Sequence, residues 1–396
     1  MIVVAALIAW GASGACGTSA RPPAIRFLHT FGPAETELLN QAMAERGIAV
    51  EPVVVPFARG RQVIADMLKA HAGCPDLIRI DATWLAGLVA DGALGKPPAA
   101  LVALDWLPEA AALAQLGGVW WAIPHSVDGL VVVRDIADPA PASPSLDDLV
   151  AAARAARTAA RRYPLGVRVD GYWFVPWLRD DGGELAAPGG LAGNGAVRAT
   201  AKLAALFGDV ARPPPPAGSE EPTELARWLG HDVAYWITGP WQLGELPDRA
   251  RIAISPLAHA PRGGQLLVVP RCAAHGELGW QLAGELTSLA TLARFAEASA
   301  SVPSRRAALD HAPALSRALY AALRDPGGDP AGTATMLPRE PVTPLLFDDL
   351  NPALAAVVAG DATADEAVAG VRRGWLRLTR AAPRTDEAPA PDRDKR

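Results

Sequence analysis

The segment DLIRIDATWLAGLVADGAL, residues 76–94, decides the fold class. It opens with DLIRID, a short and mostly apolar run that is typical of a buried strand. It continues as WLAGLVADGAL, which is typical of a helix packed by one apolar face. A strand that leads into a helix is the unit from which parallel sheets are built.

The same order occurs twice on the N-terminal side of this segment. A strand at 25–30 (IRFLHT) precedes a helix at 35–46, and a strand at 50–55 precedes a helix at 61–73. Strands that alternate with helices predict a parallel sheet in an α/β domain. Binding sites in such sheets lie beyond the carboxyl ends of the strands, so the loops after Thr30, Val55 and Asp81 are the candidates.

The alternation continues toward the C-terminus. Strands are predicted at 120–123, 129–134, 165–169, 251–257 and 265–270, and a helix runs into a strand over 224–238. Further helices are predicted at 145–162, 194–210, 277–299 and 365–381. The helix at 145 begins with a capping box of Ser145 and Asp148. Four consecutive prolines make 212–222 a surface loop, and the charged tail 381–396 is expected to be disordered.

Composition limits the class of function. The chain has 396 residues, half of them hydrophobic, which is enough for two or three domains. Its net charge is −5, and no basic cluster stands out. We therefore expect neither a nucleic-acid partner nor a polybasic membrane patch.

The first residues predict export. Residues 2–10 form an apolar run too short to span a bilayer, and small residues follow it, as in a signal peptide at 1–15. The sequence SGAC ending at Cys16 resembles a bacterial lipobox, although Ser13 stands where Leu is usual. Lipidation of Cys16 would leave 16–23 as an anchor linker. The alternative is a plain signal peptide in which Cys16 plays no part.

Motifs for catalysis are not found. The chain contains no phosphate-binding loop, no G-x-S-x-G elbow and no His pair at metal-ligand spacing. The seven His are scattered singly, which indicates surface or hydrogen-bonding roles. We expect no catalytic residues, no metal and no cofactor.

Tryptophan is the residue type that points to a ligand. There are 12 Trp against 4 Tyr, and several lie beside turns or carboxylates. A flat indole packs on the C–H face of a sugar ring, and nearby carboxylates can accept its hydroxyl hydrogen bonds. The alternative is that most Trp side chains pack in the hydrophobic core, which we expect above all for Trp228, Trp280 and Trp375.

Several stretches together resemble a known family. They are CPDLIRIDATWLAGLVADGAL (74–94), GGVWWAIPHSVDGLVVVRD (117–135), PSLDDLVAAA (144–153), DGYWFVPWLRDDGGEL (170–185), AYWITGPWQLGEL (234–246), APRGGQLLVVP (260–270), SVPSRRAALD (301–310) and MLPREPVTPLLFDDL (336–350). In order and spacing they resemble the extracellular solute-binding proteins of bacterial ABC importers. The resemblance is to the sugar-binding family that includes maltose- and trehalose-binding proteins, and it covers about 24–380.

This resemblance implies a two-lobe α/β fold of the type II periplasmic-binding-protein class, with a hinge and a ligand cleft between the lobes. Lobe one would comprise 24–125 plus 260–305, and lobe two 126–259 plus 306–380. The implied function is a monomeric receptor that delivers a di- or oligosaccharide to the permease subunits of an importer. It would be periplasmic or on the outer face of the membrane, held there only by its lipid anchor.

The resemblance also implies ligand-binding residues. From lobe one these are Phe31, Glu35, Asp81, Trp84, Gly263, Gly264, Gln265 and Arg305, while Trp121 and Asp128 flank the first crossing between the lobes. From lobe two they are Asp170, Tyr172, Trp173 and Trp241. The strand after Gly264 would run antiparallel beside the strand that ends at Asp81, which would make Cys74 and Cys272 neighbours and implies a disulfide. The alternative for these cysteines is two separate free thiols.

Two other functions remain open at this point. An exported enzyme acting on carbohydrate would need two carboxylates converging at the cleft. A sensory binding protein would present its ligand state to a receptor instead of a permease.

Overall fold

The fold is taken from a computed structural model, which describes residues 23–71, 73–185, 191, 193–214, 222–324 and 336–381. The signal peptide, the lipobox with Cys16, almost all of the anchor linker, and all but the first residue of the expected tail lie outside the described residues.

The first of two main sheets has six strands in the order β12-β6-β11-β3-β1-β2. Their bounds are β1 Ile25–His29, β2 Val50–Val54, β3 Leu77–Asp81, β6 Ile123–Gly129, β11 Arg262–Val268 and β12 Val302–Pro303. β1 pairs in parallel with β2 and β3, whereas β11 is antiparallel to both β3 and β6. Pro52 is tolerated in β2 because that strand lies at the sheet edge.

Helices cover this sheet, and together they form lobe one. They are α1 Pro33–Glu45, α2 Phe57–Ala70, α3 Leu85–Ala90, α4 Ala99–Val102, α5 Pro108–Leu113, α11 Gly276–Leu286 and α12 Leu289–Ser299. The short strands β4 (Gln115–Leu116) and β5 (Val119–Trp120) form a hairpin beside them. A 3-10 turn, Ala82–Trp84, links β3 to α3. Two apolar clusters, one on each face of the sheet, hold these layers together.

The second sheet has four strands in the order β10-β7-β9-β8. Their bounds are β7 Val131–Asp135, β8 Leu165–Gly166, β9 Tyr235–Thr238 and β10 Ile252–Ser255. The helices packed around this sheet are α6 Leu146–Ala155, α7 Gly171–Asp180, α8 Gly193–Leu206, α9 Glu224–Leu229, α10 Pro240–Leu243, α15 Thr343–Ala359 and α16 Ala364–Ala381, and α14 Ala314–Leu323 packs on both β10 of this sheet and β12 of the first. This is lobe two, and its apolar core includes Phe174, Trp177 and Tyr235.

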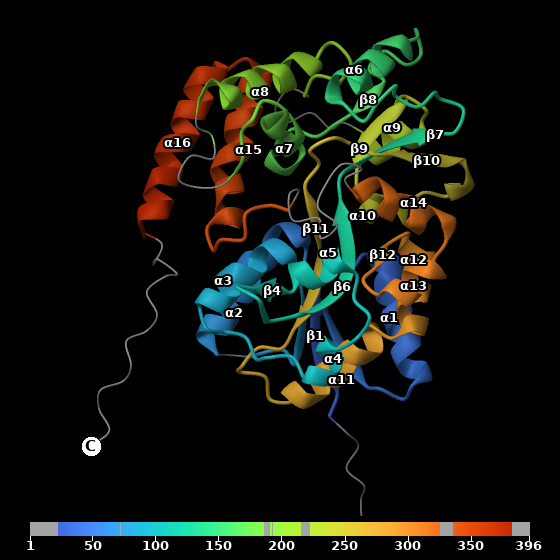
Figure 1. The fold of residues 1–396 in the computed structure, drawn as a ribbon, viewed down its shortest axis with the longest axis vertical. Helices are drawn as coiled ribbons and strands as arrows, with labels where there is room; N and C mark the ends of the chain where they lie inside the picture. Colours follow the sequence, from blue (N-terminus) through green and yellow to red (C-terminus); the bar gives the residue numbers. More distant parts are fainter. Residues whose placement is uncertain are drawn as a thin grey trace, which may run out of the picture.

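Two strands carry the chain across from one sheet to the other (Figure 1). β6 ends at Gly129 in lobe one, and β7 begins at Val131 in lobe two. The chain returns between β10 and β11. A side chain at Gly129 would lie 2.7 Å from the Pro261 carbonyl oxygen, so the two crossing segments touch backbone to backbone there.

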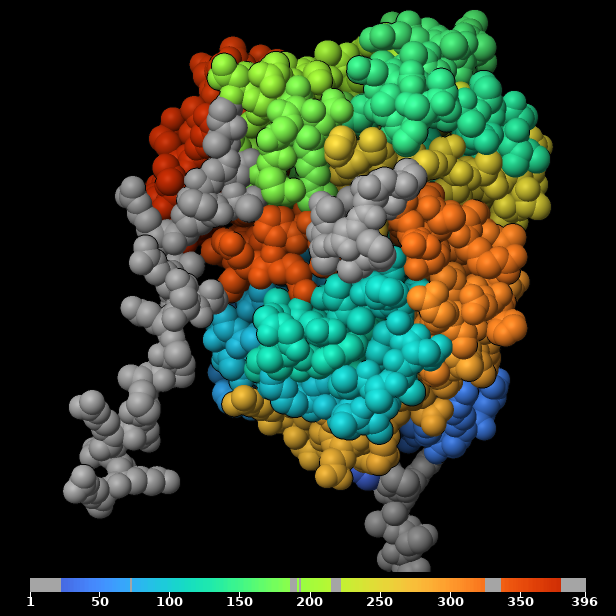
Figure 2. Space-filling model, viewed as in Figure 1, coloured from blue at the N-terminus to red at the C-terminus, as the bar shows by residue number. Residues whose placement is uncertain are grey.

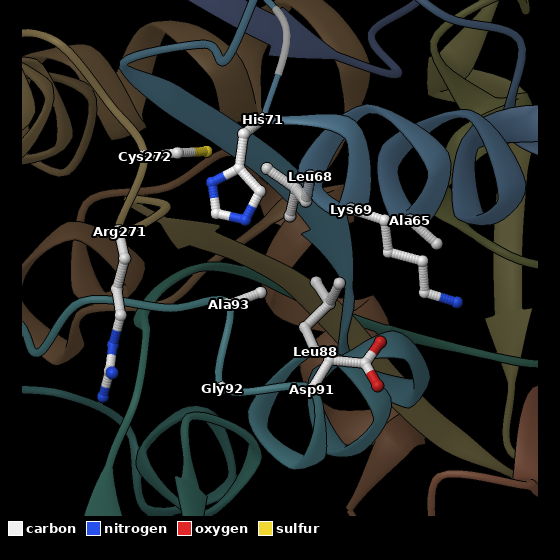
Figure 3. Close-up of a pocket in the computed structure, with 10 residues that line it drawn as sticks. All are labelled: Ala65, Leu68, Lys69, His71, Leu88, Asp91, Gly92, Ala93, Arg271 and Cys272. Atoms are coloured by element: carbon white, nitrogen blue, oxygen red, sulfur yellow. The ribbon is translucent and has the colours of Figure 1, made fainter.

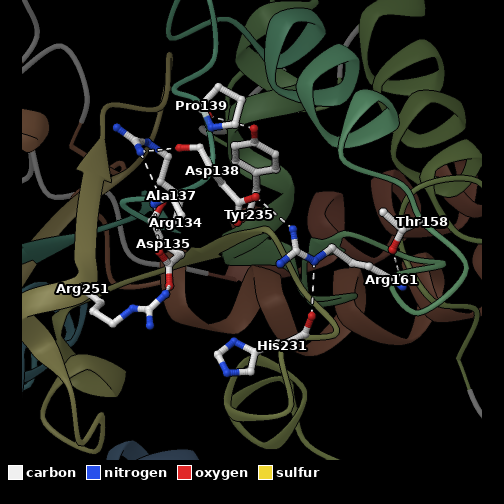
Figure 4. Close-up of polar contacts among 10 residues, drawn as sticks. All are labelled: Arg134, Asp135, Ala137, Asp138, Pro139, Thr158, Arg161, His231, Tyr235 and Arg251. Atoms are coloured by element: carbon white, nitrogen blue, oxygen red, sulfur yellow. Dashed lines mark hydrogen bonds and ion pairs between the residues drawn. The ribbon is translucent and has the colours of Figure 1, made fainter.

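Polar contacts fix the end of the second sheet where β7 finishes at Asp135, which is the opposite end of that strand from the first crossing (Figure 4). Arg161 Nη1 lies 2.9 Å from Asp138 Oδ1, and the Tyr235 hydroxyl donates to the Pro139 carbonyl at 2.8 Å. Arg251 pairs with Asp135 at 2.9 Å. These contacts tie the Pro-rich link after β7 back onto β9 and β10.

Two sequence predictions are wrong in detail. The strand predicted at 120–123 covers only the last residue of β5 and the first residue of β6, and β6 continues to Gly129 and is buried at every residue. Alternation of polar and apolar residues does not reveal this strand, because it lies inside the sheet between β11 and β12 and neither of its faces meets solvent. The helix predicted at 277–299 is two helices, since Ser288 caps α12 by accepting from Thr291 N–H.

The capping-box prediction at α6 is half right. The Ser145 hydroxyl accepts from the Asp148 N–H, but the Asp148 carboxylate accepts from the Ser143 hydroxyl instead of returning to Ser145. The crossing into lobe two also comes later than expected, because residues 126–129 belong to β6 of the first sheet. Helix α13 (Arg306–Asp310), expected in lobe two, packs on α12 and β12.

The lobes also touch away from the crossing strands. Arg61 of α2 pairs with Asp348 of α15 at 3.1 Å. Arg339 donates to the carbonyls of Ala112 and Leu113 at the end of α5. In Figure 2 the dark orange segment that leads into α15 lies between the blue-to-teal mass of lobe one and the green mass of lobe two. The structure therefore holds the two lobes in contact.

Candidate functional site

Side chains from three neighbouring strands of lobe one meet where the chain crosses between the lobes. In register, Gln265 of β11 lies opposite Asp81 of β3, and Gly263 lies opposite Asp128 of β6. Asp81 is the last residue of its strand, as the sequence predicts for a residue at a carboxyl end. We call Asp81, Asp128 and Gln265 the carboxylate group, and Gly263 borders it.

One amide joins the two carboxylates of this group. Gln265 Nε2 lies 3.2 Å from Asp128 Oδ2 and 3.4 Å from Asp81 Oδ2. Asp81 also accepts from the backbone N–H and hydroxyl of Thr83. Gln265 Oε1 is buried and has no hydrogen-bond partner among the described residues. The group thus presents more acceptors than the protein itself satisfies.

Burial changes the protonation of both carboxyls. Burial raises the pKa of Asp128 to about 7, and the neighbouring Asp81 charge adds to the rise against the lowering effect of Gln265 and Arg79. Burial likewise raises the pKa of Asp81, while the hydrogen bonds from Thr83 and Gln265 lower it. Near neutral pH, Asp128 therefore exchanges a proton readily.

Three aromatic rings of lobe two stand beside the carboxylate group. Tyr172 and Trp173 have ring centres 5.8 Å apart, and Trp241 lies 6.3 Å from the first and 6.0 Å from the second. All three pairs are edge-to-face, a favourable aromatic geometry. We call these residues the aromatic group.

The beginning of α7 positions two members of the aromatic group. Asp170 is the N-cap of α7, where it accepts from the Tyr172 N–H at 2.8 Å and from Asn351 at 3.3 Å. The Asp170 carboxylate is thus occupied by the helix end. Trp173 is 6% exposed, and its indole N–H donates to the Ile237 carbonyl at 2.8 Å. Trp173 therefore supports its two neighbours more than it faces solvent.

Trp241 is the exposed member of the aromatic group. It is 40% exposed and lies in α10, directly after the Gly239-Pro240 turn that ends β9. A side chain at Gly239 would come within 2.3 Å of the Trp241 ring. The missing side chain at Gly239 lets the indole lie over the backbone and leaves part of the ring free.

Gly263 is the point where the carboxylate and aromatic groups meet. A side chain there would lie 2.9 Å from Asp128 Oδ1 and 3.7 Å from the Tyr172 hydroxyl oxygen. That hydroxyl donates to the Pro261 carbonyl at 3.3 Å, and its pKa is raised by burial and by the charges of Asp128 and Asp81. Gly264 has a different role, because a side chain there would strike the Ser126 carbonyl within the sheet.

Five other predicted residues lie apart from these groups and have partners of their own. Trp84 is 7% exposed and packs on Phe57 with ring centres 5.3 Å apart. Lys96 Nζ lies 2.9 Å from the ring centre of Trp121 and covers one face of it. Arg305 pairs with Asp105 at 2.6 Å.

Phe31 and Glu35 complete this set. Phe31 is 3% exposed and stacks on Phe295 with ring centres 5.0 Å apart. The Glu35 carboxylate accepts from the Gly32 N–H at the start of α1. Burial lowers the pKa of Arg79, and the charge of Glu35 opposes this lowering together with those of Asp128 and Asp81, so Glu35 acts on the same buried cation as the two carboxyls.

Arg79 and two histidines were missed by the sequence reasoning. Arg79 is 8% exposed, donates to the Thr30 hydroxyl at 3.0 Å and lies 4.4 Å from the Phe31 ring centre. His29 and His125 are buried against the same ring, and burial lowers the pKa of His29 to about 4. The signal was an arginine inside the apolar strand LIRID, which must find partners if the strand is buried.

Cys74 and Cys272, the pair implied by the resemblance, form a disulfide with Cα atoms 5.9 Å apart. It joins the start of β3 to the segment after β11. Beside it lies a cavity of about 460 Å³ on lobe one, shown in Figure 3 with Lys69, His71 and Arg271 among its lining residues. No Trp, Tyr or Phe is among the ten residues that line it, so it differs in kind from the site at the crossing.

Within 23–71, 73–185, 191, 193–214, 222–324 and 336–381 there is no group of three or more His, Cys, Asp or Glu that could hold a metal ion. In those same ranges no helix has the length and apolar character to cross a membrane.

Comparisons with known proteins identify the fold. The GacH receptor of Streptomyces glaucescens GLA.O, solved unliganded and with acarbose, matches with a TM-score of 0.77 at 20% identity, over 91% of this chain and 99% of that one. The maltose/maltodextrin-binding domain MalE of Bdellovibrio bacteriovorus, bound to maltotriose, matches with a TM-score of 0.76 at 16% identity, over 90% and 100%. Maltose-bound T. maritima MalE3 matches at 0.73 and 19%, over 90% and 100%.

These similarities establish the architecture of the chain. It has the two-lobe α/β fold of type II periplasmic binding proteins, the class that the sequence predicts. No protein-family model matches the sequence, and no curated protein gives a significant match. The match is therefore one of structure, carried by ligand-binding proteins with bound sugars.

Proposed function

We propose that this protein is an extracytoplasmic receptor that binds a di- or oligosaccharide between its lobes and delivers it to an ABC importer. The observation that carries the proposal is the meeting of two kinds of side chain at the crossing. Lobe two contributes the partly exposed Trp241 with Tyr172, and lobe one contributes Asp81 and Asp128.

This combination suits the two surfaces of a sugar. The C–H face of a pyranose is apolar and packs on an indole, while its hydroxyls donate to carboxylates. Trp241 offers the first surface and the carboxylate group offers the second. Structural neighbours solved with maltose, maltotriose and acarbose support the same ligand class.

Ligand binding is coupled to the movement of the lobes. A sugar that touches both Trp241 and Asp81 gains its full binding energy only when the lobes are together, so it selects the closed form. The contacts of Arg61 with Asp348, and of Arg339 with the end of α5, would then stabilise that form. In this proposal lobe one is 24–129 plus 260–310, and lobe two is 130–259 plus 311–380, so that 126–129 and α13 belong to lobe one instead of lobe two.

The site fits binding better than hydrolysis. Asp81 and Asp128 are joined by a single Gln265 amide on one edge of one sheet, whereas glycosidase carboxylates flank the scissile bond from opposite sides. We therefore propose a receptor without catalytic residues, metal or cofactor. A monomer that is exported, lipidated at Cys16 and engaged with permease subunits is part of the same proposal, as is its place in the periplasm or on the outer membrane face.

Calorimetry on the purified protein tests this function. Titration with maltose, maltotriose, trehalose, cellobiose and other di- and oligosaccharides should find at least one that binds one to one with a Kd in the micromolar range or below. Chromatography of the same mixtures after overnight incubation should recover the sugar intact. Release of smaller sugars would favour the enzyme, and the lack of binding across the panel would reject the receptor.

A further inference from the structure

We propose that the preferred ligand is an amino sugar, an oligosaccharide that carries an ammonium group, and that Asp81, Asp128 and Gln265 receive that group. The inference rests on the proposed sugar-binding function and narrows its ligand class. It follows from three separate observations on the carboxylate group: an excess of hydrogen-bond acceptors, an excess of negative charge, and an aromatic wall beside both.

The acceptor excess is the first observation. Gln265 is 8% exposed, and its amide nitrogen is already shared between Asp81 and Asp128. Its Oε1 is buried without a partner among the described residues. A buried acceptor left unpaired is costly, so the group that completes this site must donate hydrogen bonds. An ammonium group brings three N–H donors and no acceptor.

The charge excess is the second observation. The carboxylates of Asp81, Asp128 and Glu35 all act on one buried cation, Arg79. The Arg79 guanidinium donates to the Thr30 hydroxyl and lies over the Phe31 ring, and its Nε has no partner among the described residues. Asp81 and Asp128 are two carboxyls against the one cation, so when both are ionised they leave an uncompensated negative charge in a buried place, which a cationic ligand relieves; Glu35 adds to that charge from the partly exposed start of α1.

The protein meets this excess with a proton when no ligand is present. Burial and the Asp81 charge raise the pKa of Asp128 to about 7. The titratable and charged groups around Asp128 are Asp81 and Arg79 from β3, Tyr172 from α7 and the neutral His125 on β6 itself. A ligand ammonium would take the place of the proton, so binding is coupled to proton release.

The aromatic group is the third observation. Trp241 and Tyr172 stand next to the carboxylates, with the Tyr172 hydroxyl and Asp128 Oδ1 both bordering Gly263. The Tyr172 hydroxyl donates its hydrogen bond to the Pro261 carbonyl, so it does not donate one to the carboxylates. Aromatic faces attract ammonium groups and pack on sugar rings, so the same wall serves both parts of an amino sugar.

Calorimetry with matched ligand pairs tests the inference. Each neutral sugar, such as maltotriose or cellobiose, is compared at pH 7, where the amine is protonated, with a counterpart in which one or two hydroxyls are replaced by amines, including the glucosamine disaccharide for cellobiose. We expect at least one aminated sugar to bind tenfold or more tightly than its neutral partner. That preference should fall to threefold or less in Asp128→Asn and remain in Asp147→Asn, an exposed carboxylate of α6.

The pH dependence gives an independent readout. Between pH 7 and pH 5 the affinity for the aminated sugar should fall by up to tenfold per unit, because Asp128 must lose its proton first, and this fall should be absent in Asp128→Asn. If neutral sugars bind as tightly as aminated ones, the amino-sugar inference is wrong while the receptor stands. If neither kind binds, the proposed function fails and the inference fails with it.

Discussion

Trp241 is the residue whose replacement tests the site most sharply. It is 40% exposed and stands between Tyr172 and the crossing strands, so its free face is where a sugar ring would pack. Trp241→Ala removes that face. It leaves the core intact, because Trp173, the buried neighbour, keeps its hydrogen bond to Ile237.

The expected loss follows from the exposed area. A tryptophan has a surface of roughly 250 Å², so 40% exposure leaves roughly 100 Å² free for a ligand. If a sugar covers half to all of that area, burial at about 25 cal/mol per Å² contributes about 1.3–2.5 kcal/mol. The Kd for the best oligosaccharide should then rise about 10- to 70-fold.

Calorimetry at one pH measures this loss, with thermal unfolding as a check on the fold. Leu289→Ala is the matched control, because Leu289 is 41% exposed at the start of α12. Trp241→Phe should lose less than Trp241→Ala. The reasoning is refuted if Trp241→Ala binds within twofold of the unchanged protein, or if Leu289→Ala loses as much.

Three further predictions concern Asp128 of the carboxylate group, the ion pair between the lobes and the disulfide. Because the pKa of Asp128 is raised to about 7, the stability that its protonated form contributes is lost as pH rises through about 7. Between pH 5 and 7 the free energy of unfolding of the unchanged protein should therefore fall by up to about 1.4 kcal/mol per pH unit relative to that of Asp128→Asn. Urea denaturation that gives the same difference between the two proteins at both pH values would contradict this. Arg61→Ala breaks an exposed ion pair with Asp348 and should weaken sugar binding fivefold at most. Adding Asp348→Ala should cause no further loss. A larger or additive loss in calorimetry would show that the two residues act separately. Replacing Cys74 and Cys272 by Ser opens a loop of 198 residues and should lower the free energy of unfolding by about 2–5 kcal/mol, whereas an unchanged denaturation midpoint would show that the bridge adds nothing.

The class of fold could be predicted because local patterns and global topology agree. The segment 76–94 forms β3, a 3-10 turn and α3 in the predicted order, and its strand pairs in parallel with β1 as the alternation requires. β6 could not be predicted, because the sequence PHSVDG carries no apolar alternation. Those polar residues are buried by strands distant in sequence, a fact that only the assembled sheet supplies.

The candidate site could be predicted in part. Asp81 could be inferred from its place at the carboxyl end of a predicted strand, whereas Asp128 and Gln265 were implied only by the resemblance to sugar-binding proteins; adjacent strands bring the three together. Trp84 and Trp121 could not be separated from Trp241 by sequence alone. Each stands beside a turn, and only the tertiary partners, Phe57 for the first and Lys96 for the second, distinguish a packed ring from a free one.

Arg79 is a residue of the site that the sequence pattern does not single out. It lies in a short apolar strand, and the pattern of that strand predicts burial alone. In the structure it is a buried cation on which the charges of Glu35, Asp128 and Asp81 act. Buried charges of this kind are rare, and their presence inside a predicted strand is a usable signal for a site.

A crystal structure of the protein with its best-binding oligosaccharide tests the central claim most directly. The account predicts one sugar ring packed on Trp241 and hydrogen-bonded at Asp81, Asp128 or Gln265, with both lobes in contact with the ligand. A sugar bound instead in the cavity beside Cys272, or held by one lobe alone, would contradict it.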